Sequence, residues 1–226
     1  MAYKGKTLIG IVGYTPVVET FPLGPRLMSA LTDRFGAASD VVVENMSWGP
    51  MHIVQRFQEE QTECPDRLVL IGAASVCRSP GRVGVARWVG GKLPDGEVQE
   101  RIYEAVTGIV DIENTLIIGE HFGVWPNECF TVEVDLQADA FGTMVVAESG
   151  QLDQRFDLEE QLGFSPVAVT REIASAAITI AVHGPDSNLA IKEKSATGLA
   201  PFERFTFNHV VSDREQPIAG SKEMKP

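Results

Sequence analysis

Residues 7–12 read TLIGIV, a continuously apolar run that ends at Gly13. An apolar run of this length without polar alternation is typical of a strand buried on both faces, as central strands of parallel sheets are. Residues 41–43 (VVV) and residues 68–71 (LVLI) repeat this signal. We therefore predict that the three runs form adjacent central parallel strands, with residues 7–12 between the other two.

Helical patterns separate these runs. Leu27, Ala30, Leu31 and Phe35 have the spacing of one helix face, and residues 51–61 (MHIVQRFQEEQ), 98–110 and 166–182 also favour helices. Strands that alternate with helices imply a parallel sheet covered on both faces. The predicted fold class is therefore α/β, a three-layer αβα sandwich with a mostly parallel twisted sheet. Further strands are expected at residues 83–89, 116–118, 131–134 and, as a short one, 144–147.

The composition changes near residue 184. We predict an α/β domain over residues 1–183, with an insertion at about 137–157, and a polar C-terminal tail over residues 184–226. The tail carries Phe202, Phe205 and Phe207 within six residues, and a flexible spacer rarely does so. These three rings are therefore expected to anchor the tail on a protein surface.

Charge and cysteine content exclude several classes of protein. The 226 residues hold 19 Lys and Arg against 31 Asp and Glu, a net charge of −12, which argues against binding to nucleic acid or to an anionic membrane. Cys64, Cys77 and Cys129 are scattered and form no CxxC pair, so a disulfide scaffold or zinc finger is not expected. No run approaches the ~20 apolar residues of a membrane span. We expect a soluble cytoplasmic protein.

Ligands of open parallel sheets bind beyond the carboxyl ends of the strands. The loops expected there cover residues 14–20, 44–49, 72–78 and 120–125, and they contain neither GxGxxG nor a Walker motif. Carboxylates suited to a metal ion are Glu19, Glu44, Asp95 and Glu120, although single loop carboxylates are usually only solvated. Trp48 and Trp125 are large aromatic residues that either fill the core or anchor a partner. The sequence assigns no catalytic residue.

Read as a whole, the order of these segments resembles the hydrogenase maturation proteases, metal-dependent endopeptidases that trim the C-terminus of nickel-iron hydrogenase large subunits. The resemblance runs from about residue 7 to residue 182. It is carried by TLIGIVGY with LGPRLMSAL, by VVVENMSWGPMHIVQRF, by DRLVLIGAASVCRSPGRV, and by LGFSPVAVTREIASAAITIAV. The fold that it implies is phosphorylase/hydrolase-like, in agreement with the fold class predicted above.

The resemblance also implies three positions for metal ligands, and at two of them this sequence has a residue that differs from the family's ligand. The family's metal ligands are a Glu, an Asp and a His, and they fall on Glu19, Gly72 and Asp95, with His121 as a substitute third ligand. A three-ligand site that loses a carboxylate to glycine binds a divalent ion weakly, so no firmly held nickel or zinc is expected. The family's substrate-reading loop implies the partner-binding residues Glu44, Ser47, Trp48 and Gly49.

Three functions remain open at this point. The leading hypothesis is a non-proteolytic relative that recognises a hydrogenase large subunit, or another protein partner, through the loop edge and the tail. The second is an active metal-dependent endopeptidase with relocated ligands among Glu19, Glu44, Asp95 and His121, which would use nickel or zinc. The third is a small-molecule-binding α/β protein, which predicts an apolar pocket with few charged walls.

Overall fold

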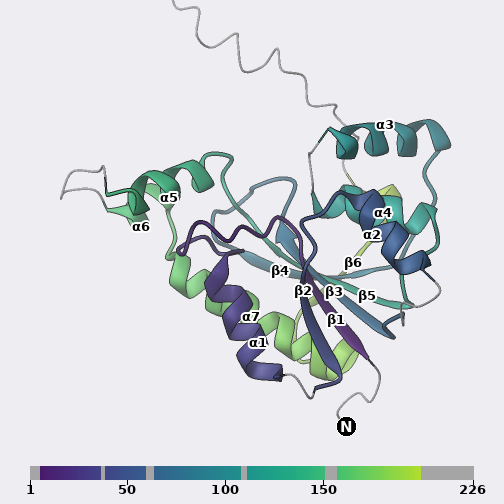
Figure 1. Ribbon diagram of the computed structural model, residues 1–226, viewed down its shortest axis with the longest axis horizontal. Helices are drawn as coiled ribbons and strands as arrows, with labels where there is room; N and C mark the ends of the chain where they lie inside the picture. The colour runs from purple at the N-terminus through teal and green to yellow at the C-terminus, as the bar shows by residue number, and fades with distance from the viewer. Residues whose placement is uncertain (1–5, 37–38, 60–63, 108–110, 151–156, 200–226) are drawn as a thin grey trace, which may run out of the picture.

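Six strands form one sheet in the order β2-β1-β3-β5-β4-β6 in the computed structural model, which describes residues 6–36, 39–59, 64–107, 111–150 and 157–199 (Figure 1). β4 runs antiparallel to β5 and parallel to β6, and the other pairs are parallel. The strands are β1 (Thr7–Ile11), β2 (Val41–Asn45), β3 (Arg67–Ala73), β4 (Val83–Trp88), β5 (Glu128–Val134) and β6 (Ile191–Lys194).

Helices cover both faces of the sheet, so the predicted three-layer α/β sandwich is confirmed (Figure 1). α1 (Pro25–Phe35) and α7 (Pro166–His183) pack on one face, while α2 (Pro50–Gln58), α3 (Asp95–Val106) and α4 (Ile112–His121) form the layer on the other. α5 (Ala140–Glu148) and α6 (Leu158–Leu162) contact each other. None of the helices in the described part of the chain is long and apolar enough to cross a membrane.

The three apolar runs form neighbouring parallel strands, as predicted. β1 lies between β2 and β3, with Ile9 opposite Val43 on one side and Val69 on the other. All five residues of β1 are buried because Ile9 and Ile11 face α1 and α7 while Leu8 faces α2 and α4. β2 lies at the edge of the sheet, so its expected central position was wrong.

The strand predicted at residues 116–118 is instead the middle of helix α4. Asp111 caps this helix, since its side chain accepts a hydrogen bond from the backbone N–H of Asn114 at 2.8 Å. The helix is buried on most sides, so its sequence TLIIG carries no amphipathic period. A short apolar run of this kind fits a strand and a buried helix equally well.

The short strand predicted at residues 144–147 is also helical, as part of α5. The residues of this helix are mostly apolar around its whole circumference, which hides the helical period. Its Glu148 accepts hydrogen bonds from the backbone N–H groups of Glu19 and Thr20, at 3.1 and 2.6 Å. Residues 151–156 of the expected insertion lie outside the described residues.

The polar segment that begins at Gly184 contributes a strand to the sheet. β6 pairs with β4 from Ile191 opposite Val85 to Lys194 opposite Trp88. Ala196, just after the strand, is buried, and its N–H donates to the carbonyl of Gly90 at 3.0 Å. The chain up to Leu199 is therefore built onto the same sheet, beyond the boundary expected at residue 183.

Candidate functional site at the carboxyl edge of the sheet

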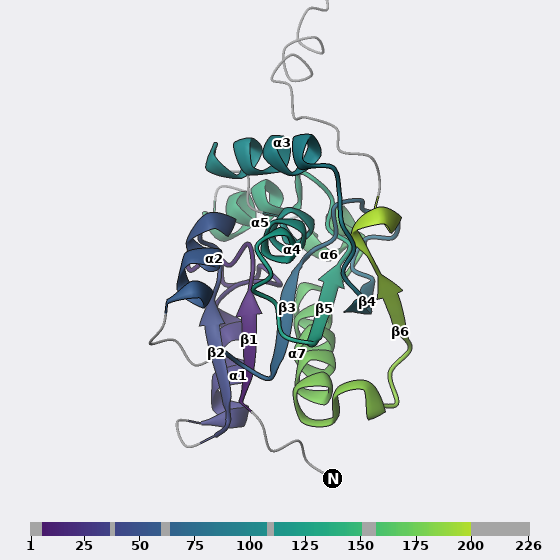
Figure 2. The same cartoon turned by 90° about the vertical axis from the view of Figure 1, so that its right-hand side faces the viewer.

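The carboxyl ends of β1, β2, β3 and β5 lie at one edge of the sheet because these strands are parallel (Figure 2). Three loops at this edge expose large apolar side chains: Val17 after β1 is 74% exposed, Trp48 after β2 is 41% exposed and Val76 after β3 is 55% exposed. Exposed apolar side chains mark a surface that meets another protein where they form one continuous patch, whereas single ones are common on any protein.

The loop after β2 is fastened to the end of β1. The N–H of Met46 donates to the carbonyl of Ile11 at 2.9 Å, and the Ser47 hydroxyl donates to the carbonyl of Tyr14 at 3.3 Å. The side chain of Asn45 accepts from the N–H of Ser47 at 2.9 Å, which closes the turn. Gly49 then precedes Pro50, the first residue of α2. The loop therefore holds Trp48 in a defined position.

Glu44, Arg56 and Trp48 form a stack beside this loop. Arg56 donates to both carboxylate oxygens of Glu44, with Nη2 at 2.6 Å from Oε1. Its guanidinium carbon lies 5.6 Å from the centroid of the Trp48 ring. The hydrogen bond that Arg56 donates to Glu44 raises the pKa of Arg56, so the guanidinium stays charged. The predicted partner-binding residues thus lie together. Glu44 is bound to Arg56, and the Trp48 side chain is exposed to solvent.

The residues implied as metal ligands lie on separate elements. Glu19 is exposed, and its carboxylate is 3.9 Å from the side chain of Arg26. Asp95 is exposed at the start of α3, and His121 at the end of α4 packs edge-on against Phe122. Among the residues that the structure describes, no three His, Cys, Asp or Glu side chains are grouped so that they could hold a metal ion.

The packing around Gly72 gives a direct test of whether the implied metal fits. A Cβ atom at this position would lie 3.4 Å from side-chain atoms of Ile112 and 3.4 Å from the carbonyl oxygen of Val12. Both distances lie at the near limit of ordinary van der Waals contact, so a Cβ itself would fit, while a longer side chain would lie against Ile112. Glycine supplies no ligand atom, and the other implied ligands are not grouped in the described part of the chain, so the residues present do not fit the metal site that the resemblance implies.

Replacing Gly72 by Asp restores the carboxylate that the resemblance implies and is expected to destabilise the protein by about 2–4 kcal/mol, because the new charge is buried against Ile112. Urea unfolding with and without added nickel or zinc checks this. Gly72→Ala is the control for crowding alone. Recovery of the lost stability on addition of nickel or zinc would contradict this interpretation of the site.

An open cavity of about 930 Å³ lies further along the carboxyl edge. The loop after β3, the end of β5, strands β4 and β6, and the outer side of α7 form its wall. Its apolar lining includes Val83, Val85 and Leu189, and its charged lining includes Arg82 and Asp135. Asp135 is 5% exposed and accepts hydrogen bonds from the backbone N–H groups of residues 78 and 79.

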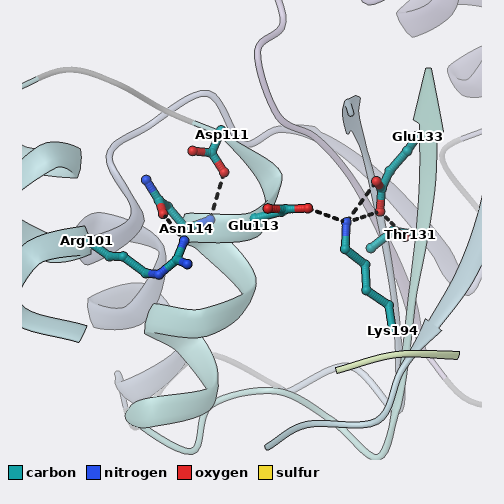
Figure 3. Close-up of polar contacts among 7 residues, drawn as sticks. All are labelled: Arg101, Asp111, Glu113, Asn114, Thr131, Glu133 and Lys194. Carbon is teal, nitrogen blue, oxygen red and sulfur yellow. Dashed lines mark hydrogen bonds and ion pairs between the residues drawn. The ribbon is translucent and has the colours of Figure 1, made fainter. Parts of the chain in front are cut away.

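A three-residue ion cluster forms part of the cavity wall (Figure 3). The Lys194 ammonium on β6 lies 2.8 Å from both carboxylate oxygens of Glu133 on β5 and 3.0 Å from Glu113 on α4. Thr131 also donates to Glu133, at 2.7 Å. Burial alone would lower the pKa of Lys194, but the two glutamates outweigh it and raise that pKa.

A second polar network lies beside this cluster, between α3 and α4 (Figure 3). Arg101 donates to the side-chain oxygen of Asn114 at 2.9 Å, and Asn114 donates to Glu104 at 2.9 Å. Burial raises the pKa of Asp111, the residue that caps α4. The network holds α3 onto α4 and so fixes the layer that carries Glu113.

Sequence reasoning missed the cavity and its ion cluster. Glu113, Glu133 and Lys194 come from a helix and two strands that are far apart in the chain, so no local motif joins them. The anchors predicted in the tail, Phe202, Phe205 and Phe207, lie outside the described residues. Comparisons of the chain with protein-family models, with curated proteins and with solved structures give no match.

Proposed function

We propose that this chain is a protein-recognition relative of the hydrogenase maturation proteases, which binds a nickel-iron hydrogenase large subunit without cleaving it. The observation that carries the proposal is the exposed position of Trp48, which contacts Arg56 and lies at the same edge of the sheet as the exposed Val17 and Val76. Tryptophan and arginine are the residues most often found at the energetic centre of protein interfaces.

The choice of partner rests on the resemblance. Residues 41–57, which resemble the family's second strand, substrate-reading loop and second helix, lie in β2, the Trp48 loop and α2. This stretch contains the whole Glu44–Arg56–Trp48 stack. A preorganised aromatic side chain loses little conformational entropy on binding, which favours recognition by this loop. A non-proteolytic role is favoured because Gly72 supplies no ligand and, among the described residues, no three His, Cys, Asp or Glu side chains are grouped into a metal site.

Trp48→Ala is expected to weaken binding of the purified large subunit by roughly 10- to 100-fold, the usual effect of removing a central tryptophan. Surface plasmon resonance with the immobilised large subunit measures the dissociation constant. Phe122→Ala is the matched control, because the Phe122 ring is 38% exposed, close to the exposure of Trp48. Phe122 lies between α4 and the amino end of β5, at the edge of the sheet opposite to the Trp48 loop. The control variant should bind as the unaltered protein does.

Two outcomes would overturn the proposal. One is equal affinity of the Trp48→Ala variant and the unaltered protein. The other is a shortened large subunit after incubation, detected by intact-protein mass spectrometry, which would establish the endopeptidase instead.

A further inference from the structure

The chain reaches the cavity at the point where the described residues end. Gly198 and Leu199 both form part of the cavity wall. The chain is therefore tethered to the cavity wall at Leu199, and an extended chain advances about 3.3 Å per residue. Twelve residues such as 200–211 can therefore reach up to about 40 Å from this tether.

The cavity floor suits aromatic side chains. On the α7 side of the sheet, Val83 and Val85 of β4 and Leu189 line it, and Ala168 on α7 faces it with only a methyl group. Small side chains on a helix beside valines leave a depression into which large rings can pack. The cavity volume of about 930 Å³ is within the range of sites that enclose several ring-sized groups.

The sequence of residues 200–211, APFERFTFNHVV, matches this lining in apolarity and in charge. Phe202, Phe205 and Phe207 supply the rings. Between them, Glu203 and Arg204 carry opposite charges, and the cavity rim offers partners for both signs. Those rim residues are Arg82 and Arg171 for the carboxylate, and Glu172 and Glu193 for the guanidinium.

We propose that residues 200–211 dock into this cavity of their own chain, with the three Phe rings on the floor formed by β4 and α7. Because Leu199 tethers the segment at the cavity wall, docking is intramolecular, and a weak intrinsic affinity is enough to fill the cavity. The docked segment covers the part of the carboxyl edge that lies beside β4 and β6. The inference concerns the protein without any partner and is independent of the proposed function.

Limited trypsin digestion of the full chain tests this inference, with Arg204 as the site within the docking segment and Arg214 as the internal control beyond it. Cleavage of a docked segment follows the population of its open form, so cleavage after Arg204 should be at least roughly tenfold slower than cleavage after Arg214. Mass spectrometry of the fragments gives both rates.

Two variants should abolish this protection from opposite sides of the contact. One replaces Phe202, Phe205 and Phe207 together by Ser, and the other is Ala168→Glu, which places a charge on the exposed side of α7 that lines the floor. Both should raise the Arg204 rate to that of Arg214. Ile218→Ser, an apolar-to-polar change further along the tail, is the matched control and should leave the rates unchanged.

The inference is overturned if Arg204 is cleaved as fast as Arg214 in the unaltered chain, or if neither variant changes the Arg204 rate. It is also overturned if protection grows with protein concentration, because the cavity would then hold the tail of a second copy. No large subunit is present in this digestion, so a failure here leaves the binding test of Trp48 untouched.

Discussion

Arg67→Ala is expected to lower the free energy of unfolding by about 3–5 kcal/mol, the usual cost of removing one partner of a buried ion pair. Arg67 is the first residue of β3, and only 2% of it is exposed. Its Nε donates to Glu128, at the start of β5, at 2.6 Å. Without the guanidinium, the Glu128 carboxylate loses this partner.

Arg67 also holds the end of α7 onto the sheet. Its Nη1 donates to the carbonyls of Ile180 and Ala181, at 3.1 and 3.0 Å. Carbonyls in the last turn of a helix have no partner within the helix, and a cation there also interacts favourably with the helix dipole. The substitution therefore removes one donor from two carbonyls and from one carboxylate, although the Ile180 carbonyl still accepts from the N–H of Gly184.

Urea unfolding followed by circular dichroism measures this effect, and the change should appear as a lower midpoint with an unchanged slope. Arg87→Ala is the control because Arg87 is an exposed arginine on β4 of the same sheet. A loss for Arg67→Ala as small as that for the control would mean that the buried contacts contribute nothing to stability.

The central strands could be predicted because their signal is local. TLIGIV and LVLI are apolar throughout, which fits strands covered on both faces, and β1 and β3 are such strands. α4 and α5 were missed for the same reason: a buried helix is also apolar throughout, and short apolar runs do not distinguish the two. The β2 edge position was missed because three valines do not indicate what lies beyond the strand.

The candidate site divides in the same way. Glu44, Trp48 and Arg56 lie within 13 residues of one another, so a strand, a loop and a helix bring them together, and the sequence predicts two of the three. The ion cluster depends on Lys194, which lies 61 residues from Glu133 in the chain. The ion cluster can form only because β6 pairs with β4. β6 lies in the polar segment after residue 184, whose composition predicts a tail and not a strand.

Lys194→Met is the second substitution with a large expected effect, a loss of about 2–4 kcal/mol in the free energy of unfolding at pH 8. The side chains of Lys194, Glu133 and Glu113 are 14%, 16% and 17% exposed, so water screens their charges only in part. Without the ammonium, two carboxylates that shared it face each other with no cation between them. Lys192→Met, an exposed lysine on the same strand, is the control.

The loss for Lys194→Met should depend on pH in a defined direction. The raised pKa of Lys194 means that its contribution in the unaltered protein is fully present below about pH 10.5 and is lost only as the pH rises through the folded-state pKa. In the variant, the two carboxylates repel each other while both are charged, so the penalty is full at pH 8 and shrinks at lower pH, where carboxyl groups begin to take up protons. The difference in unfolding free energy between variant and unaltered protein should therefore be smaller at pH 5 than at pH 8. A difference that is equal at the two pH values would show that Lys194 acts through packing of its alkyl chain, since that contribution carries no proton.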